Sequence, residues 1–301
     1  PAFDNLDVVL YLRFMTPPLL TLDSFCVAYP QQANWAVENV SLSLEPGEML
    51  GLVGESGCGK STLGRAALRL LPGGSRTDGR SLFEGRDVFG LTAQDIRRFR
   101  GEAVSLVFQD PMTRLNPLMT IGDHCVETLR AHRSDLSRQA AKEIAIATLK
   151  SVSIPASRWE QYPHEFSGGM RQRVAIALAL LLNPKLIVAD EPTTSLDVTI
   201  SAQILDLLTQ LCRERGMALI LISHDLALVG EYCDRIAVMY QGKLVELGST
   251  EQVLYQPQAP YTQSLLQAAH QLQNYEAEGV TEPENHRSEE HTSELQSRPH
   301  I

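Results

Sequence analysis

The chain has 301 residues, which is enough for one large domain or two small ones with a substantial core. Its net charge of −10 argues against a surface built for nucleic acids, so we expect no nucleic-acid partner. The longest apolar run, Val174 to Leu182, is too short to cross a bilayer, and any membrane role would have to come through a partner. The five cysteines are scattered without a C-x-x-C pair, which argues against a zinc or iron–sulfur site.

We interpret both ends of the chain as segments that do not belong to the folded protein. Met15 is a plausible natural start, so we interpret residues 1–14 as a non-native upstream segment. Residues 287–301 read like the in-frame translation of a common sequencing adapter, and we interpret them as an assembly artefact. A natural polar tail is the alternative. The fold is then expected within residues 15–272, followed by a tail over 273–286.

The first half of the chain predicts strands and one helix around a glycine-rich loop. Apolar runs predict strands over Leu20–Ala28, Val40–Leu44, Met49–Val53 and Ala103–Phe108. A helix is expected from Lys60 to Leu71, before Pro72-Gly73-Gly74.

The second half predicts a helical region followed by alternating strands and helices. Residues 117–182 are mainly helical in pattern, with polar breaks near 151–157 and Tyr162-Pro163. Further strands are expected over Leu186–Ala189, Ala218–Ile222, Ile236–Met239 and Lys243–Leu247, and short helices over Thr250–Leu254 and Thr262–Leu272. This alternation is typical of a parallel-rich α/β core with a helical insert. We find no internal repeat.

The segment between the predicted strand at Met49–Val53 and the helix at Lys60 matches the phosphate-loop pattern G-x-x-x-x-G-K-S. Its glycines let backbone N–H groups cradle phosphate oxygens, and the helix N-terminus adds positive potential. Lys60 should reach the β- and γ-phosphates, and Ser61 should ligate Mg²⁺. A glycine-rich turn with a chance Gly-Lys-Ser is the alternative. The candidate nucleotide-binding residues are Gly54, Glu55, Ser56, Gly57, Cys58, Gly59, Lys60, Ser61 and Thr62.

An acid pair, Asp190-Glu191, follows the apolar strand at Leu186–Ala189. A buried strand would deliver Asp190 to the edge where α/β sheets bind ligands, and there it would hold the Mg²⁺ shell. Glu191 can polarise an attacking water. A solvated acidic turn before Pro192 is the alternative.

A second anion site is predicted at Ser167, Gly168 and Gly169. Ser167 is a good N-cap, and the apolar positions Val174, Leu178, Leu181 and Leu182 give the helix behind it one buried face. The N–H groups at this helix start are exposed to a ligand. One bound nucleotide needs only one phosphate-binding loop, so a single chain has one anion site more than it needs.

In this order the motifs resemble those of ATP-binding-cassette (ABC) ATPases over residues 20–271. The resemblance implies a P-loop core with a RecA-like sheet, an N-terminal antiparallel β part, and a helical subdomain over about 111–182. It also implies ATP and Mg²⁺ as cofactors. Ser167-Gly168-Gly169 is similar to the family's signature motif, which caps the γ-phosphate held by the phosphate loop of a second subunit, so a homo- or heterodimer is expected.

The resemblance assigns further site residues. Gln109 lies in a segment similar to the Q-loop and would contact Mg²⁺ and water, and His224 is placed as the switch histidine near the γ-phosphate. Asp197 lies in the D-loop. Tyr29 stands where the family stacks an aromatic ring on adenine, although packing at a strand end is the alternative.

Some details resemble the oligopeptide, dipeptide and nickel importer subgroup. They are Gly54-Glu55-Ser56-Gly57, the segment from Pro111 to Pro117, Met170-Arg171-Gln172-Arg173-Val174 and Pro260-Tyr261-Thr262. The resemblance implies a peripheral ATPase subunit at the cytoplasmic face of a bacterial inner membrane, coupled to permease subunits and indirectly to an external solute-binding protein. Residues 111–126 would help receive a permease. A cassette in a soluble complex, for instance in phosphonate degradation, is the alternative, and a DNA-repair or translation protein fits poorly.

Overall fold

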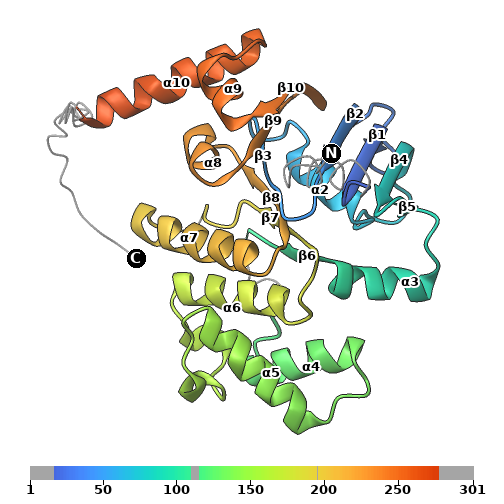
Figure 1. Ribbon diagram of the computed structural model, residues 1–301, viewed down its shortest axis with the longest axis vertical. Coiled ribbons are helices and arrows are strands. Elements are labelled where there is room, and N and C mark those ends of the chain that lie inside the picture. Colours follow the sequence, from blue (N-terminus) through green and yellow to red (C-terminus); the bar gives the residue numbers. More distant parts are fainter. Residues whose placement is uncertain (1–16, 110–114, 195, 278–301) are drawn as a thin grey trace, which may run out of the picture.

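The computed structural model describes residues 17–109, 115–194 and 196–277 (Figure 1). Two sheets form its frame. The larger has six strands in the order β10-β9-β3-β8-β7-β6, and the smaller has four in the order β2-β1-β4-β5.

The six-stranded sheet is parallel except at one edge, where β10 runs antiparallel to β9. Its strands are β3 (Met49–Val53), β6 (Val104–Val107), β7 (Leu186–Asp190), β8 (Ala218–Ser223), β9 (Arg235–Tyr240) and β10 (Lys243–Ser249). The crossovers place helices on its faces, as expected for an α/β core.

The four-stranded sheet is antiparallel throughout. Its strands are β1 (Leu20–Ala28), β2 (Val37–Leu44), β4 (Arg76–Phe83) and β5 (Arg86–Asp87). It packs beside α2, which follows the phosphate loop (Figure 1). This arrangement confirms the predicted fold class, including its N-terminal antiparallel β part.

The described residues form the helices α2 (Lys60–Ala67), α3 (Ala93–Arg98), α4 (Ile121–His132), α5 (Arg138–Ser151), α6 (Gly168–Leu180), α7 (Val198–Glu214), α8 (Leu226–Tyr232), α9 (Thr250–Tyr255) and α10 (Pro260–Ala277), with short helical turns η1 (Phe99–Ala103), η3 (Ala156–Arg158) and η4 (Pro163–Glu165). Helices α2, α7 and α8 pack against strands of the large sheet. Helices α4, α5 and α6 form a separate group, the projecting helices, which contacts the sheet through α6 and β6 (Figure 1). None of the helices in the described ranges is both long and apolar enough to cross a membrane.

The large sheet is buried on both faces. Along β3, Met49 and Val53 belong to one apolar cluster, whereas Leu50 and Leu52 belong to the other. Such two-sided burial explains why the strand is a continuous apolar run rather than an alternating one.

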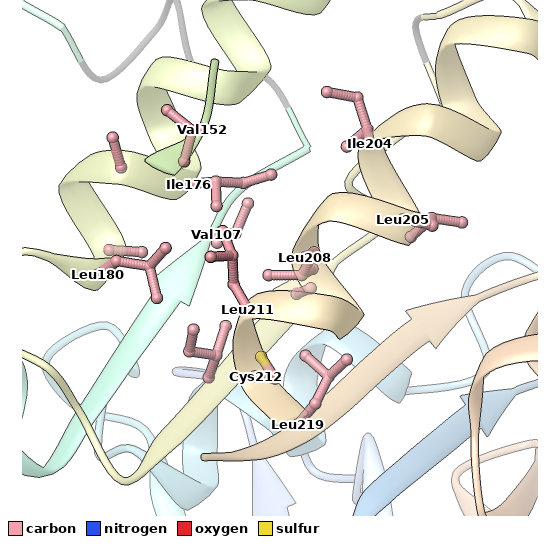
Figure 2. Packing of buried hydrophobic residues seen from close by; sticks show 14 of the residues in the cluster. Val107, Val152, Ile176, Leu180, Ile204, Leu205, Leu208, Leu211, Cys212 and Leu219 are labelled. Carbon is pink, nitrogen blue, oxygen red and sulfur yellow. The ribbon is translucent and has the colours of Figure 1, made fainter. Parts of the chain in front are cut away.

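Helix α7 joins the sheet to the projecting helices. Its Leu208 is fully buried, and in Figure 2 it lies among Ile176 of α6, Val107 of β6 and Leu219 of β8. The projecting helices therefore share one apolar cluster with the sheet.

The predicted strands are all present, but helix α2 ends four residues before the predicted Leu71. Arg69 takes a left-handed conformation with φ 55°. Its N–H donates to the carbonyl of Ala66, and the N–H of Leu70 donates to the carbonyl of Arg65. These two bonds form a Schellman motif, which usually contains glycine rather than arginine. The guanidinium of Arg69 donates to the carbonyl of Leu91 at 2.9 Å and holds the turn in place.

The burial of α7 gives a prediction for stability. Replacing Leu208 by Ala should lower the free energy of unfolding by about 2–5 kcal/mol, because it removes buried methyl groups and leaves a cavity. Urea unfolding followed by circular dichroism measures the change. Val198→Ala on the same helix is the matched control, because Val198 is 88% exposed and should change stability little. Equal losses in the two variants would show that α7 does not anchor the core.

Candidate functional site

Three parallel strands of the large sheet end side by side, and a polar segment follows each of them. The register pairs Val53, at the end of β3, with Ser223, at the end of β8, and pairs Asp190, at the end of β7, with Ile222. Glu191 then donates its backbone N–H to the carbonyl of Ile222 at 3.0 Å. The phosphate loop and the acid pair therefore meet at the sheet edge where α/β proteins bind ligands.

The loop between β3 and α2 requires glycine at both ends. A Cβ on Gly54, which has φ 147°, would lie 2.2 Å from the carbonyl oxygen of Met239. A Cβ on Gly59, with φ 104°, would lie 2.7 Å from the carbonyl oxygen of Ala36. Gly59 is also the N-cap of α2, and no side chain caps this helix start among the described residues. The uncapped N–H groups and the helix dipole make it an anion-binding site.

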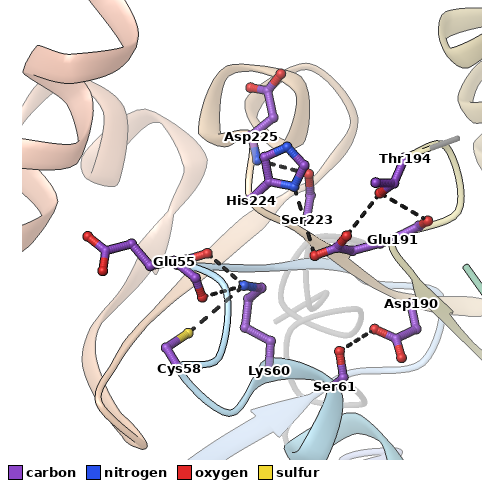
Figure 3. A network of polar contacts seen from close by, with 11 residues as sticks. Glu55, Cys58, Lys60, Ser61, Asp190, Glu191, Thr194, Ser223, His224 and Asp225 are labelled. Carbon is purple, nitrogen blue, oxygen red and sulfur yellow. Dashed lines mark hydrogen bonds and ion pairs between the residues drawn. The ribbon is translucent and has the colours of Figure 1, made fainter. Parts of the chain in front are cut away.

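Lys60 lies against the inside of this loop (Figure 3). Its ammonium donates to the carbonyls of Gly54 at 2.6 Å and Glu55 at 2.9 Å, and the residue is only 4% exposed. The thiol of Cys58 is 4.0 Å from the ammonium nitrogen, and burial raises the pKa of this thiol above its ordinary value. Ser56 and Gly57 form the exposed tip of the loop.

Asp190 is held by two residues of α2. Ser61 Oγ donates to Asp190 Oδ1 at 2.6 Å, and the guanidinium of Arg65 donates to Asp190 Oδ2 at 2.8 Å. The carboxylate is 4% exposed, so the ion pair offsets part of the cost of burying its charge. A hydroxyl beside a carboxylate is an oxygen donor set that suits Mg²⁺. Sequence reasoning missed Arg65, although its position four residues after Ser61 places both on one face of α2.

Glu191 is the first residue after β7, and its backbone is left-handed with φ 48°. Thr194 Oγ1 donates to Glu191 Oε2 at 2.9 Å, and His224 Nδ1 lies 3.8 Å from Glu191 Oε1 (Figure 3). The structure thus brings the predicted base and the predicted switch histidine together. Thr194 was missed, and only its position three residues after Glu191 could have marked it.

Two further predicted residues lie at the flanks of this edge. Tyr29 directly follows β1, and its hydroxyl is 2.9 Å from the hydroxyl oxygen of Thr62 in α2. Gln109 is exposed two residues after the end of β6, the strand next to β7. Residues 110–114 of the segment expected to meet a permease lie outside the described residues, as do residues 1–16, 195 and 278–301.

The predicted second anion site is the start of α6. Ser167 caps the helix, with its hydroxyl accepting the N–H of Met170 at 3.4 Å, and both Ser167 and Gly168 are exposed. A Cβ on Gly169 would lie 2.7 Å from Ile200 in α7, so this turn packs closely against the start of α7.

Asp197 forms that start. Its carboxylate accepts the N–H of Ile200 at 2.9 Å and caps α7. Within the described part of the chain, no hydrogen bond or ion pair joins Ser167, Gly168, Gly169 or Asp197 to the phosphate loop. The start of α6 is therefore not bonded to the start of α2 in the described residues.

The chain matches the family model described as ABC transporter over residues 37–194. It is 49% identical over 235 residues to the dipeptide transport ATP-binding protein DppD of Bacillus subtilis, covering 77% of this chain and 70% of that protein. It is 47% identical over 248 residues to the oligopeptide transport ATP-binding protein OppD of Escherichia coli, covering 82% of this chain and 72% of that protein.

Solved structures agree with these matches. The dimeric post-hydrolysis structure of the ATP-binding cassette MJ0796 bound to ADP and Pi superposes with a TM-score of 0.67 at 27% identity, covering 77% of this chain and 98% of that one. The structure of cbiO1 from Clostridium perfringens, part of the ABC transporter complex cbiONQ, superposes with a TM-score of 0.69 at 26% identity, covering 85% and 99%. The fold, the sheet edge and the relatives lead to one conclusion: the chain belongs to the ABC transporter family.

Proposed function

We infer that this chain is the ATP-hydrolysing subunit of an ABC importer that takes up oligopeptides or dipeptides through membrane permease subunits. The observation that carries this proposal is the meeting of Lys60, Ser61, Asp190 and Glu191 at one sheet edge. The chain also shares 47–49% identity with the dipeptide and oligopeptide transport ATP-binding proteins described above. Their descriptions favour peptides over nickel, and transport over a soluble complex.

The phosphate loop would hold the phosphates of ATP. Backbone N–H groups of residues 59–61, at the uncapped start of α2, offer donors to the phosphate oxygens. Lys60 would exchange its two loop carbonyls for oxygens of the β- and γ-phosphates. Tyr29 would stack on adenine, with its hydroxyl already held beside Thr62.

Ser61 and Asp190 would hold Mg²⁺, with Gln109 approaching from the end of β6. When bound there with ATP, the ion would supply positive charge beside the phosphates. Arg65 keeps the carboxylate of Asp190 in place, so that its other oxygen faces Ser61.

Hydrolysis would depend on Glu191. Its carboxylate would polarise the attacking water and accept a proton from it. Thr194 fixes one oxygen of that carboxylate, and His224 lies near the other, where it would contact the γ-phosphate.

The second anion site would act on a partner subunit. Ser167, Gly168 and Gly169 would cap the γ-phosphate held by the phosphate loop of a second cassette, and Asp197 would lie at the same interface. Two ATP molecules would then favour a closed dimer, and loss of the γ-phosphates would reverse that bias. The partner can be a second copy of this chain or a related cassette.

The membrane partners would bind the projecting helices. We place the ABC ATPase domain at residues 15–272 and its helical subdomain at about 111–182, with residues 111–126 helping to receive a permease. The chain would lie at the cytoplasmic face of the membrane, and an external solute-binding protein would reach it only through the permease.

Glu191→Gln should lower ATP turnover by roughly 10²–10⁴-fold, because an amide cannot accept the proton from water. ATP binding should persist, and a closed dimer should accumulate. Phosphate release and size-exclusion chromatography with ATP measure the two effects, and Glu251→Gln on α9 is the matched control. Near-normal turnover in Glu191→Gln would remove Glu191 from the role of base.

Lys60→Ala should act on binding rather than on turnover alone. Charged hydrogen bonds of this kind are worth roughly 1.5–3 kcal/mol, so the Kd for ATP should rise by about 10- to 150-fold. Fluorescence titration with a labelled ATP analogue measures it, with Lys150→Ala at an exposed position as control. An unchanged Kd would mean that Lys60 does not contact the phosphates.

Gly168→Asp tests whether the site is shared between chains. If it is shared, a dimer with Gly168→Asp on one chain and Lys60→Ala on the other keeps one complete site and hydrolyses ATP. A dimer with both changes on one chain and none on the other keeps no complete site and should be inactive. The opposite ranking of the two differentially tagged dimers would show that each chain completes its own site.

A further inference from the structure

The phosphate loop is also contacted by the C-terminal helix. The backbone N–H of Glu55 donates to the hydroxyl of Tyr261 at 3.2 Å, and Tyr261 is the second residue of α10. The two residues are 206 positions apart in the chain. This contact plays no part in the reaction described so far.

The same peptide unit also contacts Lys60. The carbonyl of Gly54, which accepts the Lys60 ammonium at 2.6 Å, belongs to the peptide bond whose N–H is that of Glu55. A trans peptide is planar, so its N–H and C=O point in opposite directions and turn together. Tyr261 therefore holds one side of a peptide plane whose other side holds Lys60.

Tyr261 is itself firmly placed. Its ring lies against the ring of Tyr240, with centroids 4.3 Å apart, and Tyr240 ends β9, which pairs with β3. Just before α10, the carboxylate of Glu246 accepts the N–H groups of Gln258 at 2.7 Å and Ala259 at 3.1 Å. The helix start is thus tied to β10 while its tyrosine reaches the loop.

The hydroxyl of Tyr261 suits this task chemically. Burial raises the pKa of its phenol above the ordinary value, so the oxygen stays uncharged at neutral pH and accepts an amide proton. Phenylalanine would keep the ring packing and lose only this acceptor.

We propose that Tyr261 is a positioning residue for ATP binding: it orients the Gly54–Glu55 peptide and thereby sets the place from which Lys60 reaches the phosphates. The proposal rests on the phosphate-loop function inferred above. It makes α10 a structural support of the nucleotide site, although the helix contributes no residue to the reacting atoms.

The test compares Tyr261→Phe with Tyr255→Phe, a matched change at a tyrosine of α9 that is 79% exposed. Hydrogen–deuterium exchange of overlapping peptides within residues 50–58, in nucleotide-free protein, isolates the exchange of the Glu55 amide by difference. Losing one hydrogen bond should speed this exchange by about five- to ten-fold in Tyr261→Phe and leave it unchanged in Tyr255→Phe.

Nucleotide binding is the second readout. The Kd for the ATP analogue and the KM for ATP should rise by about five-fold in Tyr261→Phe, with kcat within two-fold of the unchanged protein. A purely structural role would not separate KM from kcat in this way. If Tyr261→Phe destabilises the fold, Glu246→Gln should still speed the exchange of Glu55, because it loosens the entry to α10 without changing the ring.

The outcomes separate the two proposals. Unchanged exchange at Glu55 in both Tyr261→Phe and Glu246→Gln overturns the role of Tyr261. Faster exchange in Tyr261→Phe with an unchanged Kd for nucleotide overturns it as well. Failure of the wild-type protein to bind ATP would instead contradict the proposed function. The exchange data would still decide whether Tyr261 holds the loop.

Discussion

The parallel alignment of β3, β8 and β7 is the constraint on which the site depends. Its ladder pairs Val53 with Ser223 and Asp190 with Ile222, so three chemically different segments begin at the same height along the sheet. A shift of one strand by one residue would turn its side chains to the other face, since residues alternate along a strand. The buried apolar clusters on both faces of the sheet oppose such a shift. The apolar packing on the two faces of the sheet therefore helps to fix the distance between Ser61 and Asp190.

The starts of α2 and α6 differ in what surrounds them, and this difference underlies the proposed role of a partner subunit. The start of α2 faces the acid pair within the chain, whereas the start of α6 packs against α7 and exposes Ser167 and Gly168. The helix dipole favours an anion at either start, and the start of α2 also has the buried Lys60 and the carboxylate of Asp190 beside it. Under the proposed function, the start of α2 would bind phosphate within one chain, and the start of α6 would act on the nucleotide of a second chain.

Much of the fold could be read from the sequence, because parallel strands buried on both faces appear as short apolar runs. Met49–Val53 and Leu186–Ala189 are such runs, and each precedes a recognisable motif. Strand β4 was not anticipated, since its first five residues are polar or glycine and mostly exposed. The early end of α2 was also missed, because nothing in the sequence marks Arg69 as the residue that turns left-handed.

The site followed the same rule. The motifs led to the residues that the fold brings together at the sheet edge, and they did not point to the residues that contact those from elsewhere. Arg65 and Thr194 stand close to motifs but carry no pattern of their own. The contact between Tyr261 and Glu55 joins distant parts of the chain, and only the folded structure reveals it.

The left-handed backbone at Glu191 would oppose stability to activity under the role proposed for this residue. A residue other than glycine in the left-handed region costs roughly 1–2 kcal/mol, and the cost is greater for branched side chains. Glycine would relax the turn after β7, yet it would also remove the carboxylate. Under the role proposed for Glu191, selection for stability and selection for ATP hydrolysis favour different residues at this position, and a copy released from hydrolysis would be free to lose the acid.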